Sequence, residues 1–134
     1  MAEATIQAAL MERVESLPGS LPIAWPGVPF DTPSTDFLRV THMRAEPSRT
    51  FVTSADPLER FGLLQIDLFT VVTAGSHQIK ADTIADQIIT HFPRGLSLAS
   101  GRLWVMKSWA LPGRRDQDGA HWQTPIRVTY RGAI

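Results

Sequence analysis

The sequence predicts an α+β domain in which two helices cover one face of a mainly antiparallel four-stranded sheet. Apolar residues recur at three- and four-residue spacing in residues 2–17 and 77–92, as they do along one face of a helix. They alternate with a period of two in residues 61–72 and 122–131, as in half-buried strands. With two further strands, the order is helix, strand, strand, helix, strand, strand. Short connections within each strand pair favour hairpins, and the two amphipathic helices can share one face.

The first helix, residues 2–17, carries an apolar stripe of Ile6, Ala9, Leu10, Val14 and Leu17. A connection at residues 18–33 follows and contains five prolines. Because each proline removes a backbone donor and restricts the residue before it, we expect no regular structure there. The connection nevertheless contains Trp25 and Phe30. These large side chains either plug the edge of the domain or offer a contact surface to a neighbouring molecule.

A strand at residues 36–43 is followed by a long segment, residues 44–60, with two prolines and charges of both signs. This composition predicts a long loop or a wide hairpin between two antiparallel strands. Loops of this length in a compact domain are usually functional or mobile. We therefore expect an arm that contacts a partner, with Arg44, Arg49 and Arg60 as candidate contacts.

The strand at residues 61–72 and the helix after it form the centre of the predicted fold. One side of the strand carries Leu64, Ile66 and Leu68, and a break at residues 74–76 supplies Ser76 as a helix N-cap. The helical stripe that follows consists of Ala81, Ile84, Ala85, Ile88 and Phe92. A strand that leads into an amphipathic helix buries both apolar faces together, so we expect the other elements to pack on this pair.

The C-terminal part predicts a strand at residues 101–109, a turn at residues 111–120 and a final strand at residues 122–131. Pro125 lies within the final strand and favours an edge position or a bulge. Trp122, Thr124, Ile126, Val128 and Tyr130 would share one face of it. The face of the sheet without helices would then hold Gln65, Asp67, Arg127 and Thr129.

The composition suits a single domain, residues 1–134, because 43% of the residues are hydrophobic. The chain has no cysteine, which excludes disulfides, thiolate metal sites and a cysteine nucleophile, and fits a reducing compartment. No apolar run approaches the roughly 20 residues of a membrane span. The N-terminus lacks the basic and apolar regions of a secretory signal. We therefore expect no membrane partner.

Charge is distributed unevenly along the chain, although the formal net charge is zero. From Arg94 onward there are seven basic residues and two acidic ones, a net charge of +5, so the earlier residues sum to −5. A net charge of zero argues against a general nucleic-acid binder. A chain with two oppositely charged parts could associate head to tail, although asymmetry in the sequence need not survive as asymmetry in space.

The residues that could carry chemistry do not form a catalytic, cofactor or metal motif. The four histidines, His42, His77, His91 and His121, lack the spacing of a helical metal pair, and no nucleophile elbow or phosphate loop occurs. His91 is best explained by a favourable dipole contact at a helix end, and His42 by a place on the surface. Asp82 and Asp86 lie one helical turn apart and are interpreted as solvated.

The densest charge cluster is Arg114-Arg115-Asp116, in the predicted hairpin turn. It is either a soluble turn or a contact point for the next subunit or for DNA that passes nearby.

Several segments resemble one known family. They are AALMERVESL, LPIAWPGVPFDTP, FLRV, GLLQIDLFTVVTAGS and the helix after it, and the terminal W-TPIRVTYR. Together they make the chain similar to the tail terminator (tail completion) proteins of long-tailed phages, prophages and gene transfer particles. The most specific parts are I-x-W-P-x-x-x-F at Ile23 to Phe30 and the strand–Ala74-Gly75–helix unit that ends at Phe92. These are signatures of a fold and an assembly role, and they identify no site residue by residue.

The resemblance implies a structural virion protein and no enzyme. Such proteins form a six-membered ring on the last ring of the tail tube, stop its polymerisation and present a surface to the head connector or head completion protein. The implied partners are other copies of the chain, the major tail tube protein, the connector, and DNA that passes through the lumen without sequence reading. The implied location is the head-proximal end of the tail, after assembly in the host cytoplasm. We expect neither cofactor nor metal. The candidate interface residues are Arg44, Arg49, Arg60, Arg114, Arg115, Asp116, Trp25 and Phe30.

Two other functions fit the same pattern. One is another tail or neck component, such as a head–tail joining protein or a tube subunit, which would stack into filaments. The other is a small-molecule-binding or enzymatic α+β domain, which would have a deep apolar pocket with convergent polar groups.

Overall fold

The computed structural model describes residues 2–45, 48–49, 58–72 and 77–133. Helix α1 (Ala2–Glu15) and helix α2 (His77–His91) accompany a sheet that dominates the molecule. The four long strands are β2 (Phe37–Arg44), β4 (Leu58–Val71), β6 (Leu103–Ala110) and β8 (His121–Ala133). The short ones are β1 (Ile23–Ala24), β3 (Ser48–Arg49), β5 (Ser97–Leu98) and β7 (Arg114–Arg115), and a 3-10 turn spans Ala99–Gly101.

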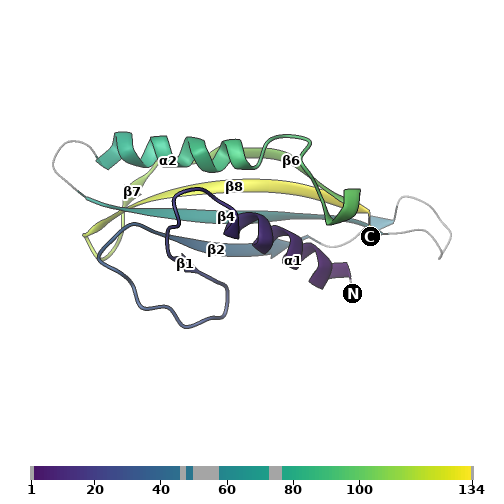
Figure 1. Ribbon diagram of the computed structural model, residues 1–134, viewed down its shortest axis with the longest axis horizontal. Helices are drawn as coiled ribbons and strands as arrows, with labels where there is room; N and C mark the ends of the chain where they lie inside the picture. Colours follow the sequence, from purple (N-terminus) through teal and green to yellow (C-terminus); the bar gives the residue numbers. More distant parts are fainter. Residues whose placement is uncertain (1, 46–47, 50–57, 73–76, 134) are drawn as a thin grey trace.

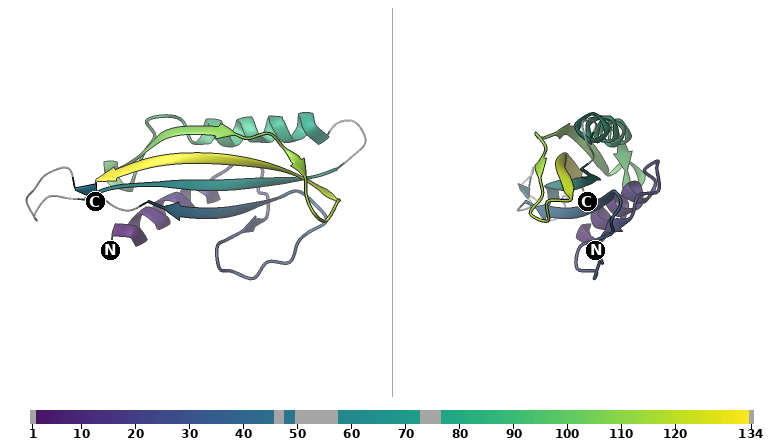
Figure 2. Two further views of the ribbon diagram at one scale, coloured as in Figure 1. Left: turned by 180° about the vertical axis from the view of Figure 1, so that it is seen from behind. Right: turned by 90° about the vertical axis from the view of Figure 1, so that its left-hand side faces the viewer.

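The long strands lie side by side in the order β2, β4, β8, β6, and every pair among them is antiparallel. Strand β1 extends the sheet beyond β2 in a parallel pairing, and β5 extends it beyond β6. Strands β3 and β7 pair with β4 and β8 respectively. Figure 1 shows the long strands running the length of the molecule, with α2 along the β6 and β8 side. The end-on view in Figure 2 shows that the sheet is curled.

One core holds both helices against the same face of the sheet. Both predicted stripes bury their main residues, each of which is at most 3% exposed. They are Ile6, Leu10 and Val14 of α1, Ala81, Ala85 and Ile88 of α2, and Phe92 directly after α2. From the sheet, Leu64, Ile66 and Leu68 of β4 and Ile126 and Val128 of β8 join them. Burial of this apolar surface is the main stabilising term of the fold.

The opposite face of the sheet, here called the open face, is polar over most of its length. Gln65 and Arg127 share this face, as the sequence predicts, and the register places them opposite each other, with Leu63 opposite Thr129. The Arg127 guanidinium donates to the side-chain oxygen Oε1 of Gln65 (3.2 Å), and the side-chain amide nitrogen of Gln65 donates to the Asp67 carboxylate (2.9 Å). One end of the face is covered, because the rings of Phe30, Phe37, Phe69 and His121 pack together there.

The α+β class, the two helices and the four long strands are as the sequence predicts, but a sheet of only four antiparallel strands is wrong in detail. The four short strands were not predicted, and β1 adds a parallel pair. The connection at residues 18–33 was expected to lack regular structure, yet Ile23–Ala24 forms β1 between Pro22 and Pro26. Two residues can pair because Pro22 keeps its carbonyl, which accepts from the Leu38 N–H (2.9 Å).

The predicted arm at residues 44–60 is partly hairpin, because β2 and β4 stay paired as far as Arg44 and Gly62 and β3 pairs with β4. Its residues 46–47 and 50–57 lie outside the described residues, as does the predicted N-cap Ser76.

Candidate interaction surfaces

The first candidate surface lies where α1 meets the ends of β2 and β4, and it contains two of the predicted contact arginines. Arg60 pairs with Glu3 of α1 at 2.8 Å, and Arg44 pairs with the same carboxylate at 3.3 Å and donates to Gln7 at 3.0 Å. A groove lined by these four residues and Met11 opens beside them. Both arginines therefore hold α1 on the sheet, and the cluster keeps a net positive charge on its surface.

Beneath this cluster, Tyr130 of β8 is buried against β4 and its hydroxyl lies 2.6 Å from Nε2 of His42. Burial raises the pKa of Tyr130 to about 12, with a smaller contribution from the Glu3 carboxylate. Burial, and then the Arg44 charge, lower the pKa of His42. His42 was interpreted as a surface residue, which is wrong, because its partner lies two strands away on the helix-facing side.

The second candidate surface lies at the other end of the sheet, in the hairpin that carries β7. Strand β7 pairs Arg114 with Gln123 and Arg115 with Trp122, so the predicted turn contains a short strand. Arg114 and Arg115 are exposed, and with Asp116 they line a hollow of about 370 Å³ that Arg39, Gln117 and Gln123 complete. Arg39 comes from β2, where its guanidinium lies over the Phe69 ring at 4.9 Å.

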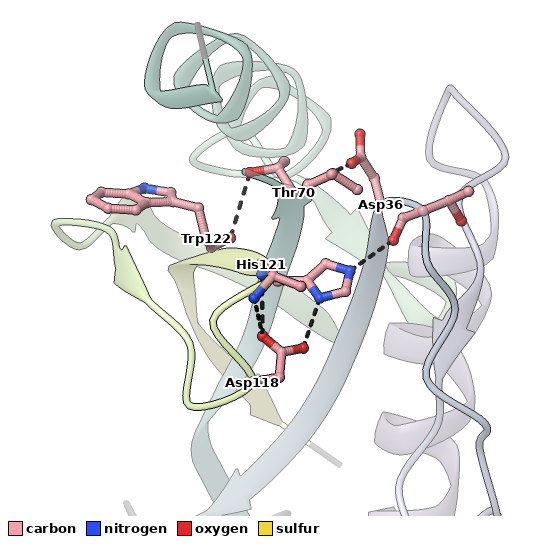
Figure 3. Close-up of polar contacts among 8 residues, drawn as sticks. Asp36, Thr70, Asp118, His121 and Trp122 are labelled. Atoms are coloured by element: carbon pink, nitrogen blue, oxygen red, sulfur yellow. Dashed lines mark hydrogen bonds and ion pairs between the residues drawn. The ribbon is translucent and has the colours of Figure 1, made fainter. Parts of the chain in front are cut away.

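A buried histidine fixes the position of this hairpin relative to the segment just before β2. Nδ1 of His121 lies 2.8 Å from the Asp118 carboxylate, and Nε2 lies 3.1 Å from the Thr35 carbonyl (Figure 3). Burial opposes a charge on the ring, but the hydrogen bonds to Asp118 and Thr35 outweigh it and raise the pKa of His121. The hydrogen bond from His121 in turn lowers the pKa of Asp118.

Asp36 ties the neighbouring strand ends together. One of its carboxylate oxygens accepts the Val71 N–H (2.9 Å), and the other pairs with Lys80 of α2 (2.8 Å). The start of β2, the end of β4 and the start of α2 are thereby joined at one residue. Figure 3 shows the contact of Asp36 with the end of β4.

A third contact joins the C-terminal ends of the two helices. The Arg13 guanidinium donates twice to the His91 carbonyl (3.0 and 2.8 Å), while the His91 ring lies 2.7 Å from the Ser16 hydroxyl. Burial, and then the Arg13 charge, lower the pKa of His91. His91 lies in the last turn of α2, as the sequence predicts, and the Arg13 guanidinium adds a cation at the same helix end.

The remaining predicted contacts lie elsewhere. Trp25 packs against the main core, and the Phe30 ring lies 5.5 Å from that of Phe37, so both make packing contacts within the chain and stay half-buried. Arg49 lies in β3 opposite Leu58, and its side chain falls outside the described part of the structure. The eight predicted contacts thus do not form one surface. Two of them meet at the α1 end of the sheet, and three meet at the β7 end.

Residues that carry chemistry are scattered. Within the described ranges, no group of three His, Asp or Glu side chains could hold a metal ion. None of the described helices is long and apolar enough to cross a membrane. Sequence reasoning missed Arg39 and His121. Arg39 reads as an ordinary exposed residue of a strand, and nothing in the sequence marks it as part of a site. For His121, the Asp-x-x-His spacing at 118–121 could have suggested a local pair.

A family model described as phage tail terminator protein matches residues 5–130, nearly the whole chain. The chain belongs to this family. Two solved structures share its fold at low identity. One carries no functional description. It is 22% identical to this chain with a TM-score of 0.78, and the match covers 100% of this chain and 97% of the solved chain. The other comes from the virion of a native gene transfer agent particle. It is 14% identical to this chain with a TM-score of 0.52, and the match covers 96% of this chain and 94% of the solved chain. A search of curated proteins found no match.

The tail terminator family consists of structural tail proteins, so the chain is a structural component of a phage-type tail. The two solved structures add support for the fold alone.

Proposed function

We propose that this chain caps the tail tube as a ring of six copies, ends tube polymerisation and presents the surface to which the head connector or head completion protein binds. The observation that carries the proposal is the family match over residues 5–130. The ring sits at the head-proximal end of the tail, assembles in the host cytoplasm, and lets DNA pass through its lumen without reading the sequence. The protein acts by binding and catalyses no reaction.

The exposed edge of the sheet supports assembly with further copies. Strand β5 pairs with β6 only at Leu103 and Trp104, so within the described residues the outer edge of β6 has no strand partner from Met106 to Ala110. A groove lined by Ile89, Thr90, Met106 and Ser108 runs between this edge and α2. Met106 is 44% exposed there. An unpaired edge with exposed apolar atoms readily pairs with another chain, and closing a ring satisfies it.

Such a contact would be heterologous, because the edge of β6 on one copy would meet a different part of the next copy. Heterologous contacts close into a ring when the rotation between copies permits it, and otherwise they grow into a filament. A terminator requires the closed outcome, whereas a tube subunit stacks further.

The test is electron microscopy of the purified protein, alone and mixed with its tail tube protein. The proposal predicts single closed rings, free in solution or seated on one end of each tube. Filaments of the protein alone would contradict it in favour of a tube subunit. Rings that bind a connector but never a tube end would favour a head–tail joining protein.

A further inference from the structure

The hollow at the β7 end of the sheet is lined by three arginines that form no ion pair among the described residues. They are Arg39, Arg114 and Arg115, and Asp116 is the one carboxylate among the described residues of the lining. Arg39 is held in place over the Phe69 ring, which is fully buried. Gln117 and Gln123 add side-chain amides beside the guanidinium groups. The hollow therefore offers convergent donors to an anion.

Helix α2 carries the opposite charge on its outer face. Asp82 and Asp86 are exposed one turn apart, and Ile79, which is 72% exposed, lies about one turn before them. Neither carboxylate forms an ion pair within the described residues. Lys80, the one lysine of the same helix, forms an ion pair with Asp36. We call Ile79, Asp82 and Asp86 the acidic stripe.

Arg39 of the hollow and the acidic stripe lie on opposite sides of the sheet, and among the described residues no ion pair joins the hollow to the stripe. The neighbours of Arg39 in β2, Leu38 and Val40, point into the core that the helices cover, so Arg39 points to the open face. Helix α2 packs on the other face through Ala85 and Ile88. Asp82 and Asp86 therefore cannot reach Arg39 in their own chain, whereas those of another copy can approach the hollow.

We propose that the hollow of one copy receives Asp82 and Asp86 from the acidic stripe of the next copy. This inference rests on the proposed ring and identifies two surfaces that meet in it. A carboxylate is favoured over a DNA phosphate because the chain itself supplies unpaired carboxylates with a neighbouring apolar side chain, and its net charge of zero gives DNA no general attraction. Two different patches on one chain make a heterologous contact of the kind a ring needs.

The test is a charge swap in the full chain, followed by sedimentation velocity at about 50 mM and about 500 mM salt. One variant carries Arg114→Glu and Arg115→Glu, a second carries Asp82→Lys and Asp86→Lys, and a third combines all four. Arg102→Glu, at an exposed arginine just before β6, is the control, because it reverses a charge outside both the hollow and the acidic stripe. Circular dichroism confirms that each variant is folded.

Each pairwise reversal is expected to raise the protein concentration needed for assembly by roughly tenfold or more at low salt, because like charges then face each other. The combined variant is expected to assemble like the wild type, and the control is expected to assemble normally. Wild-type rings that every reversal leaves intact would overturn this docking and leave the proposed ring standing. A wild-type chain that forms no ring, even with the tube protein, would refute the proposed function and the docking together.

The same variants test the competing anion. Binding of a fluorescent DNA duplex to the wild type, lost in the Arg114→Glu, Arg115→Glu variant while its rings persist, would assign the hollow to phosphate and overturn the inference.

Discussion

The packing of Tyr130 over Gly62 predicts that Gly62→Ala is among the most destabilising small substitutions in the sheet. The two residues lie directly opposite each other in β4 and β8. A methyl group at position 62 would lie 2.2 Å from the Tyr130 hydroxyl oxygen and 2.5 Å from Cζ of the ring. Non-bonded carbon atoms rest about 3.5–4.0 Å apart, so the ring would have to move by about 1 Å or more.

The size of the effect follows from two terms. Displacing a buried side chain by overpacking costs about 1–3 kcal/mol, and the hydrogen bond between Tyr130 and His42 contributes about 1 kcal/mol. We expect the free energy of unfolding to fall by about 2–4 kcal/mol, which lowers Tm by about 10 °C in a domain of this size. The assay is thermal unfolding followed by circular dichroism, with urea unfolding to confirm the free energy.

Gly132→Ala in β8 is the matched control. Its methyl group would meet the Arg102 carbonyl and the Leu103 side chain at 3.3 Å, a distance that small adjustments can relieve. We expect a change below about 1 kcal/mol there. The reasoning would be refuted if Gly62→Ala melted within about 2 °C of both the wild type and Gly132→Ala.

Three further predictions concern single contacts. Tyr130 is the chain's one tyrosine, so absorbance titration should give a pKa of about 12 in the native protein, against about 10 in urea. The free energy of unfolding should fall as the pH rises from about 10 to about 12, because only the unfolded chain then loses the tyrosine proton. A native pKa near 10 would contradict the burial of the Tyr130 hydroxyl. The pKa of His121 is raised, so its contribution to stability is present below about pH 6.5 and is lost as the pH rises through the native pKa. Loss of this pH dependence in Asp118→Asn is the expected result, and an unchanged dependence would exclude the pair as its source. Arg13→Ala should lower the free energy of unfolding by about 1–2 kcal/mol in urea, because the His91 carbonyl loses both donors. Arg13→Lys should restore only part of the lost free energy of unfolding. Equal stability of the wild type, Arg13→Ala and Arg13→Lys would count against this contact.

The long elements could be predicted because each buries one face on its own period. Leu64, Ile66 and Leu68 alternate along β4, and the register that buries them also places Gln65 opposite Arg127 on the open face. One-sided burial specifies register strongly, since a slip of one residue would expose the whole apolar set.

The short strands could not be predicted, because pairings of two residues carry no period. Strand β1 forms because the chain passes beside Leu38, a contact set by tertiary packing. The hollow around Arg39 was missed for a related reason. Its residues come from β2, β7 and β8, and only the curled sheet brings them together.

The roles of the histidines likewise depend on residues distant in sequence. His42 meets Tyr130, and His91 meets Arg13, across separations of 88 and 78 residues. Spacing within the chain could exclude a helical metal pair but could not locate these partners.

The most direct test of the account is the length of tails made by particles that lack this chain. If it caps the tube, tails should vary widely in length, extend beyond the wild-type value and remain unjoined to heads, and supplying the chain should restore both length and joining. Tails of wild-type length joined to heads in its absence would contradict the account.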